Sequence, residues 1–371
     1  MNPSEYPLKR EERVLFQLRA LYQKYGYAQY KMGKFEEYDL YVRNKDFLVS
    51  DGVITFTDTD GRLMALKPDV TLSIIKNTRD MDDCVQKVCY SENVYRISGS
   101  TRQFKEIMQT GLECIGDVDL YNLCEVIGLA AQSLDAIDPE NVLELSHLGV
   151  IAALVNELDL EDDVQAAVLQ CIGEKNADGI RKLCPGKDIG AVLQLIASHG
   201  SPEQVIAALR PWCKQGLAKA TLEELETVTR LVGRPNVQID FSIVNDMNYY
   251  NGIVFQGYIK GIPSGVLSGG QYDKLMQRMG RRSRAVGFAI YMDLLERLGG
   301  EARPYDVDSV LLYGEGADVA ALSGEVARLA AEGSVIALKA VPEKLRYRRL
   351  IRFDGRGAAA GKGGAGDAAT D

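Results

Sequence analysis

The chain has 371 residues, of which 46% are hydrophobic and 26% are charged, and this composition predicts a globular protein of two or three domains. Its net charge of −9 at pH 7 argues against a tRNA-binding protein, because proteins that bind nucleic acid usually present a basic face. No stretch approaches the roughly 20 apolar residues of a membrane span, and the N-terminus lacks the layout of a signal peptide.

The cysteines and histidines set further limits. The seven cysteines include no C-x-x-C pair, which predicts mostly buried free thiols in a reducing cytoplasm, with Cys84 and Cys89 in the core. The two histidines leave little scope for a histidine-rich metal site. We therefore expect a cytoplasmic protein without a metal or a cofactor.

The N-terminal part predicts helices and strands in turn. Residues 11–25 have the apolar spacing of an amphipathic helix. Residues 53–66 predict a hairpin around an Asp- and Gly-containing turn, and residues 68–77 predict a helix that opens with proline. Two strands follow, over residues 88–96 and 105–115.

The composition and the predicted secondary structure then change twice along the chain. A helix over 120–134 and a short strand over 142–145 lead into residues 159–234, where Leu, Ala, Glu and Gln dominate and a run of helices is predicted. Strand alternation returns over 237–244.

The C-terminal part predicts a β-α-β fragment. Its strands cover residues 308–313 and 334–338, with a helix between them. Residues 355–371 are rich in Gly and Ala and predict a disordered tail. Basic runs at 278–284 and 344–352 are typical of solvated faces or partner contacts, with a phosphate or RNA contact as the alternative.

Alternation along residues 108–115 indicates a cavity. Gln109, Gly111 and Glu113 fall on one face of this strand, and small or polar residues on one face of a central strand leave room there. Glu113 and Asp69 are candidates for an ammonium or an imidazole N–H, and Gln109 offers a donor and an acceptor.

Three further side chains are candidates for the same cavity. Tyr249 and Tyr250 precede an Asn-Gly hairpin signal, and strand alternation predicts that only one of them faces the cavity. Arg96 either binds a carboxylate or pairs with a local acid. The alternative for the whole set is a group of residual polar residues that satisfy one another.

Five segments follow one another in a characteristic order. They are LKPDVTLSI at 66–74, VYRI at 94–97 with KEIMQTGLE at 105–113, NYYNGIVF at 248–255, GGQYDKL at 269–275, and AVGFAIYMDLLERL at 285–298. In this order they resemble the motifs L-R-P-E-x-T, F-R-x-E with R-x-F-x-Q-x-G-x-E, D-Y-Y-x-x-x-V-F, G-G-R-Y-D-x-L and A-V-G-F-A-x-G-x-E-R-L of the histidyl type of class II aminoacyl-tRNA synthetase.

The departures from these motifs concern the residues that handle ATP. In register with the family, its ATP-binding arginine falls on Leu294 and a nearby glycine falls on Tyr291. A second arginine falls on Asn245, so that Arg96 alone remains of three. Phosphoryl chemistry depends on positioned cations. We therefore expect no adenylate formation and no enzymatic activity of the chain itself.

The resemblance implies an α+β fold. We expect a class II synthetase-like core over residues 1–300, with an antiparallel sheet of six or seven strands flanked by helices and a helical insertion over 159–234. Residues 304–354 make about half of an anticodon-binding domain and are expected to be a vestigial α/β C-terminal segment.

The chain has the motif segments of the histidyl enzymes but lacks two of their arginines. In this it resembles their non-catalytic paralogue, the regulatory subunit of ATP phosphoribosyltransferase. That resemblance implies a short-form catalytic subunit as partner, a class II-type dimer, and histidine feedback in the first step of histidine biosynthesis. Histidine as effector would bind at Asp69, Thr71, Arg96, Gln109, Glu113, Tyr249 and Tyr250. An active histidyl-tRNA synthetase and a synthetase-like histidine or RNA sensor stay open as alternatives.

Overall fold

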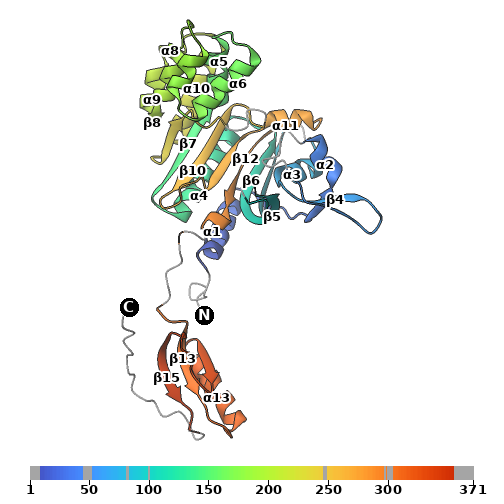
Figure 1. Cartoon of the computed structure of the whole chain (residues 1–371), viewed down its shortest axis with the longest axis vertical. Coiled ribbons are helices and arrows are strands. Elements are labelled where there is room, and N and C mark those ends of the chain that lie inside the picture. Colours follow the sequence, from blue (N-terminus) through green and yellow to red (C-terminus); the bar gives the residue numbers. More distant parts are fainter. Residues whose placement is uncertain are drawn as a thin grey trace. The chain divides into compact units, whose positions relative to one another are not determined.

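A computed structural model describes the chain. The described residues are 9–44, 52–80, 83–98, 101–244, 249–295, 298 and 304–354. The chain divides into two compact units, Met1–Leu298 and Gly299–Asp371 (Figure 1). The predicted tail over 355–371 and Asn245, the predicted replacement of an arginine, lie outside the described residues.

A mixed sheet forms the centre of the first unit. Within the described residues it has nine strands in the order β1-β5-β6-β12-β11-β10-β7-β9-β8, and the six from β5 to β7 are all antiparallel. These six are β5 (Val85–Ile97), β6 (Phe104–Gly116), β12 (Arg284–Tyr291), β11 (Leu267–Gln271), β10 (Ile253–Ile259) and β7 (Asn141–His147).

Short strands extend the sheet at both edges and make it mixed. β1 (Ala28–Gln29) pairs with β5 in parallel, β9 (Val237–Asp240) pairs with β7 in parallel, and β8 (His199–Gly200) pairs with β9. The α+β class is confirmed. The expectation of six or seven antiparallel strands is wrong at these edges. The two-residue strands β1 and β8 give too short a pattern to predict, whereas β9 lies within the strand predicted over 237–244 but pairs in parallel.

Two helices cover one face of the sheet. α4 (Leu120–Ile137) packs across β7, β10 and β12, and α1 (Arg10–Lys24) packs on α4. α1 buries Val14, Leu18 and Tyr22, which recur every four residues and so share one helix face. Asp119 begins α4 with a capping box, in which its side chain accepts a hydrogen bond from the Asn122 N–H.

The opposite face carries a smaller layer. A three-stranded antiparallel sheet lies beside two helices, and their apolar side chains form a second core cluster with residues of β5. The predicted hairpin over 53–66 is confirmed by two of these strands. The elements are β2 (Phe35–Glu37), α2 (Tyr38–Arg43), β3 (Thr55–Thr57), β4 (Leu63–Leu66) and α3 (Thr71–Asn77).

Six helices lie between β7 and β9 in the sequence and form a helical group beyond that edge of the sheet (Figure 1). An ion pair of 2.5 Å between Lys175 Nζ and Asp240 joins this group to β9. The helices are α5 (Leu148–Asn156), α6 (Asp162–Gly173), α7 (Ala177–Leu183), α8 (Gly190–Ala197), α9 (Pro202–Leu209) and α10 (Gly216–Val232).

The second unit is a small parallel sheet with one helix. β13 (Val307–Leu312) lies between β14 (Val335–Leu338) and β15 (Tyr347–Arg352), and α13 (Val319–Ala330) packs on β14. β15 was not predicted, because its residues read as a basic run. Its Ile351 is buried in the core, and its Arg349 donates hydrogen bonds to Ser309 and Glu332.

Two smaller findings bear on the sequence analysis. The core position expected for Cys84 is wrong, because Cys84 immediately precedes β5 and is exposed. No helix in the described parts of the chain is long and apolar enough to cross a membrane.

Candidate functional site

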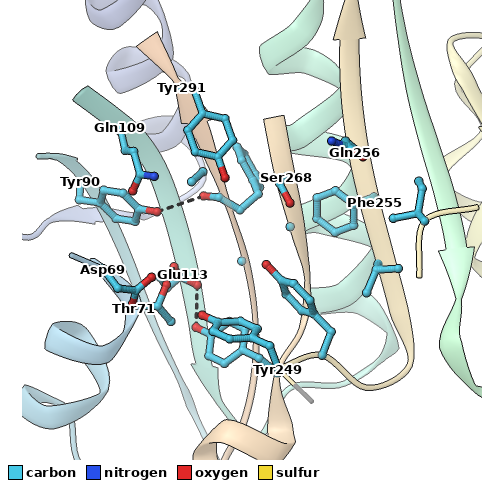
Figure 2. A pocket seen from close by; sticks show the side chains of 18 of the residues that line it. Asp69, Thr71, Tyr90, Gln109, Glu113, Tyr249, Phe255, Gln256, Ser268 and Tyr291 are labelled. Carbon is cyan, nitrogen blue, oxygen red and sulfur yellow. Dashed lines mark hydrogen bonds between the residues drawn. The ribbon is translucent and has the colours of Figure 1, made fainter. Parts of the chain in front are cut away.

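A cavity of about 210 Å³ opens on the face of the sheet opposite α4. Alternation along β6 confirms its predicted position, since Gln109 and Glu113 line the cavity while Leu112 and Cys114 belong to the core. The structure brings all seven candidate residues to this cavity: Asp69, Thr71, Arg96, Gln109, Glu113, Tyr249 and Tyr250. Figure 2 labels five of them, Asp69, Thr71, Gln109, Glu113 and Tyr249.

Glu113 is the centre of one end of the cavity. Its side chain is buried, and its two carboxylate oxygens accept hydrogen bonds from Thr71 Oγ1 at 2.9 Å and from the Tyr272 hydroxyl at 2.6 Å. Asp69 lies at the same end and accepts a hydrogen bond from the Leu72 N–H at 2.8 Å, which fixes it at the start of α3. We call Asp69, Thr71, Glu113 and Tyr272 the acid end.

Tyr272 is a lining residue that the sequence analysis missed. It lies within the GGQYDKL segment, whose pattern does not indicate that its tyrosine lines the cavity. The hydrogen bond that it donates to Glu113 spans 159 positions of sequence. The contact depends on the spatial proximity of β6 and the start of a helix far away in the sequence, which a local sequence pattern cannot predict.

Gly287 makes room for Glu113. The two residues are partners across β12 and β6. A Cβ atom on Gly287 would overlap the Glu113 carboxylate and would lie 2.5 Å from the Leu112 carbonyl oxygen. The glycine of the AVGF segment is therefore required by the buried acid opposite it.

Burial controls the protonation of both acids. Removal from water raises the pKa of Glu113 to about 8, against the opposing effect of the hydrogen bonds from Tyr272 and Thr71. Burial also raises the pKa of Asp69, against the hydrogen bond from Leu72 and the charge of Arg96. Two acids that are held out of water favour a cationic ligand, which would supply the missing counter-charge.

Both tyrosines of the predicted pair line the cavity. The expectation that only one of them faces it is wrong, because Tyr249 and Tyr250 precede β10 and are not constrained by strand alternation. Their ring centroids are 4.5 Å apart, and the Tyr249 ring lies 5.9 Å from that of Tyr272. The wall beside the acid end is therefore aromatic.

Arg96 lies beside Tyr291, and its charge opposes the rise in the pKa of both Tyr291 and Asp69. Its Nε donates to the Pro68 carbonyl at 2.9 Å. Tyr291 and the Gln109 side chain lie together at the end of the cavity away from Glu113, with the Tyr291 hydroxyl directed into the cavity (Figure 2). We call Arg96, Gln109 and Tyr291 the cation end.

Leu294 does not reach the cavity. It lies on α12 (Met292–Leu295), is partly buried and packs against the main core. Arg96 is thus the single cation among the described lining residues. In the described parts of the chain, no group of three His, Cys, Asp or Glu side chains is arranged to hold a metal ion.

Comparison with known proteins places these features in context. The family model of histidyl-tRNA synthetase matches residues 2–295. An ATP phosphoribosyltransferase regulatory subunit from Clostridium kluyveri is 30% identical to the chain over 301 residues, which are 77% of this chain and 77% of that protein.

Two solved structures share the fold. One is the crystal structure of an ATP phosphoribosyltransferase regulatory subunit/histidyl-tRNA synthetase from Bacillus halodurans, with a TM-score of 0.76 and 22% identity over 92% of this chain and 93% of that chain. The other is a chain of the ATP phosphoribosyl transferase (HisG:HisZ) complex from Thermotoga maritima, with a TM-score of 0.61 and 23% identity over 76% of this chain and 97% of that chain. These likenesses confirm a class II synthetase-like fold.

Proposed function

We propose a function from the premise that the chain belongs to the ATP phosphoribosyltransferase regulatory subunits, a family with the histidyl-tRNA synthetase fold. The chain is a non-catalytic subunit that a short-form ATP phosphoribosyltransferase requires for activity. It binds histidine and reports the level of this end product to its catalytic partner. The two chains act as a cytoplasmic hetero-oligomer, in which this subunit forms a class II-type dimer.

The observation that carries the proposal is that the cavity has several acidic and polar lining groups but few cationic ones. The acid end keeps Glu113, Thr71 and Tyr272 in one hydrogen-bonded cluster, with a second buried carboxyl group, Asp69, beside it. The cation end offers Arg96 as the one guanidinium among the described lining residues. The cavity thus suits the binding of a small cation and is poorly equipped for ATP.

Charge stabilisation explains why such a cavity does not form an adenylate. The transferred groups of ATP develop negative charge, which enzymes neutralise with several positioned cations. Loss of one such donor typically costs about 3 kcal/mol of barrier. The sequence register assigns two of these positions to Asn245 and Leu294, neither of which is cationic. Their joint loss supports a binding role over a catalytic one.

Histidine suits the groups that remain. Its ammonium would pair with Asp69, its imidazole N–H would meet Glu113, and its carboxylate would face Arg96. Each oxygen of a carboxylate has two lone pairs, so Glu113 can accept a further hydrogen bond beside those from Thr71 and Tyr272. With a single cation for the carboxylate, we expect modest affinity.

Allosteric control requires that histidine bind two states of the complex with different affinity. We propose that histidine binds the inhibited assembly more tightly. The net charge of −9 argues against tRNA as a ligand of this complex.

Mixing the purified chain with a short-form ATP phosphoribosyltransferase tests the proposal. We expect phosphoribosyl transfer to ATP to depend on this chain, the two proteins to elute together, and histidine to inhibit the mixture. A catalytic subunit that turns over at full rate alone would contradict the activation role. ATP–pyrophosphate exchange with histidine by this chain alone would instead support an active histidyl-tRNA synthetase.

A further inference from the structure

Tyr291 closes the cavity from the end of β12. Residues 287, 289 and 291 share the cavity face of this strand, and they run from Gly287 through Ala289 to Tyr291. The first two are small and leave the floor open, whereas the third is large. Tyr291 is also the cross-strand partner of Gln109 on β6. The small residues Gly287 and Ala289 therefore leave space in the cavity, and the Tyr291 side chain bounds it at the cation end.

The chemistry of Arg96 decides whether the Tyr291 hydroxyl accepts or donates in the contact between them. Burial raises its pKa, while Arg96, within hydrogen-bonding reach, opposes that effect. A guanidinium only donates, so the phenol oxygen is the acceptor in its contact with Arg96. The phenol proton remains available for a second partner. A carboxylate is an acceptor that the phenol and the guanidinium can bind together.

We propose that Tyr291, beside Arg96, recognises the free carboxylate of the ligand, and that its ring excludes any larger group joined to that carboxylate. This proposal rests on the proposed function, in which the ligand is histidine. It makes Tyr291 a residue that determines specificity for the free amino acid over its esters, amides and adenylates.

Calorimetric titration of the full chain with histidine, histamine and histidine methyl ester tests the proposal. Histamine lacks the carboxylate, and the ester lacks its charge and adds a methyl group. For Tyr291→Phe we expect histidine affinity to fall about 10-fold, as for a lost hydrogen bond to a charged group, while histamine affinity stays unchanged. For Tyr291→Ala we expect histidine to bind more weakly and the ester to bind more tightly than to the wild type.

Tyr121→Phe is the matched control, because the exposed Tyr121 hydroxyl contacts Glu125 on α4, outside the residues that line the cavity. Its titrations should equal those of the wild type. Histidine binding that Tyr291→Phe leaves unchanged, or an equal loss for histidine and histamine, would overturn the role of Tyr291 and leave the proposed function intact. A folded wild-type chain that binds no histidine would instead overturn the proposed function, and the proposal for Tyr291 with it.

Discussion

The acid end and the cation end of the cavity differ in how completely their polar groups are paired. At the acid end, both oxygens of Glu113 and one oxygen of Asp69 accept hydrogen bonds from named donors. At the cation end, Arg96 donates to the Pro68 backbone carbonyl and contacts the Tyr291 hydroxyl. The Gln109 amide makes no hydrogen bond with a described residue. The acid end is preorganised, and the cation end leaves donors for a ligand.

This difference predicts at which end of the cavity a substitution destabilises the protein more. Buried groups in a satisfied network are costly to disturb, because each loss leaves a partner unpaired. Groups at the cation end have fewer hydrogen bonds within the protein to lose. We therefore expect substitutions at the acid end to affect both folding and binding, and substitutions at the cation end to affect mainly the choice of ligand.

Gly287→Ala should have the largest effect. The added Cβ would collide with the Glu113 carboxylate and the Leu112 carbonyl, so we expect the free energy of unfolding to fall by about 3 kcal/mol. Urea denaturation followed by circular dichroism measures this change. Gly128→Ala is the control, since its Cβ meets no atom within 4 Å and lies within α4, where alanine favours the helix. Equal stability of the two variants would contradict the tight contact at Gly287.

Glu113→Gln should lower the affinity for histidine by roughly 30-fold, about 2 kcal/mol, because it removes a buried charge-assisted partner. Inhibition by histidine should weaken equally, while activation of the catalytic subunit persists. Titration calorimetry and the phosphoribosyl transfer assay measure the two effects. Glu106→Gln, on the exposed part of the same strand, should change neither. Unchanged inhibition in Glu113→Gln, with histidine located elsewhere by crystallography, would remove the cavity from consideration.

The protonation of Glu113 predicts how pH affects the empty cavity. Its pKa in the folded chain, about 8, lies above its ordinary value of 4.5, so the folded state holds this proton more tightly than the unfolded state. The resulting stability is fully present below pH 4.5 and is lost as pH rises toward 8. Glu113→Gln should therefore show a smaller loss of stability between pH 5 and pH 8 than the wild type. Parallel stability curves for the two proteins would contradict the raised pKa.

The same shift predicts the pH dependence of binding. The imidazole N–H that meets Glu113 favours the ionised carboxylate, so histidine binding should release a proton below pH 8. The affinity should therefore increase as pH rises toward 8, by at most about tenfold per pH unit. Calorimetry in buffers of different ionisation enthalpy counts this proton. Proton uptake over the whole range from pH 6 to pH 8 would show that Glu113 binds the ligand in its neutral form.

Local pattern predicted the site well where one element decided it. Gln109 and Glu113 followed from alternation along a single strand, and the hairpin at 53–66 followed from its turn residues. Tyr249 and Tyr250 were misjudged because strand alternation was applied before the strand begins at Ile253.

Non-local contacts account for what the sequence could not predict. The contact between Tyr272 and Glu113 depends on how a helix start meets a distant strand. β15 was hidden by its charge, since its arginines pair with residues such as Glu332 that a linear pattern cannot bring near. The room that Gly287 leaves for Glu113 likewise depends on strand register.

Leu294→Arg should have the smallest effect on catalytic activity, and it tests whether the cations of a synthetase site are missing at one position or at several. Leu294 packs against the core from α12 and lines no part of the cavity, while Tyr291 lines it at the position where the motif register predicts a glycine in the synthetases. The motif register predicts a second missing cation at Asn245, so a single arginine at position 294 would not restore the set. We expect no ATP–pyrophosphate exchange from this variant, and none from Leu294→Arg combined with Tyr291→Gly, because phosphate charge needs several cations at once. Exchange activity in the double variant but not in the single one would show that the phenol, rather than the number of cations, prevents adenylate formation.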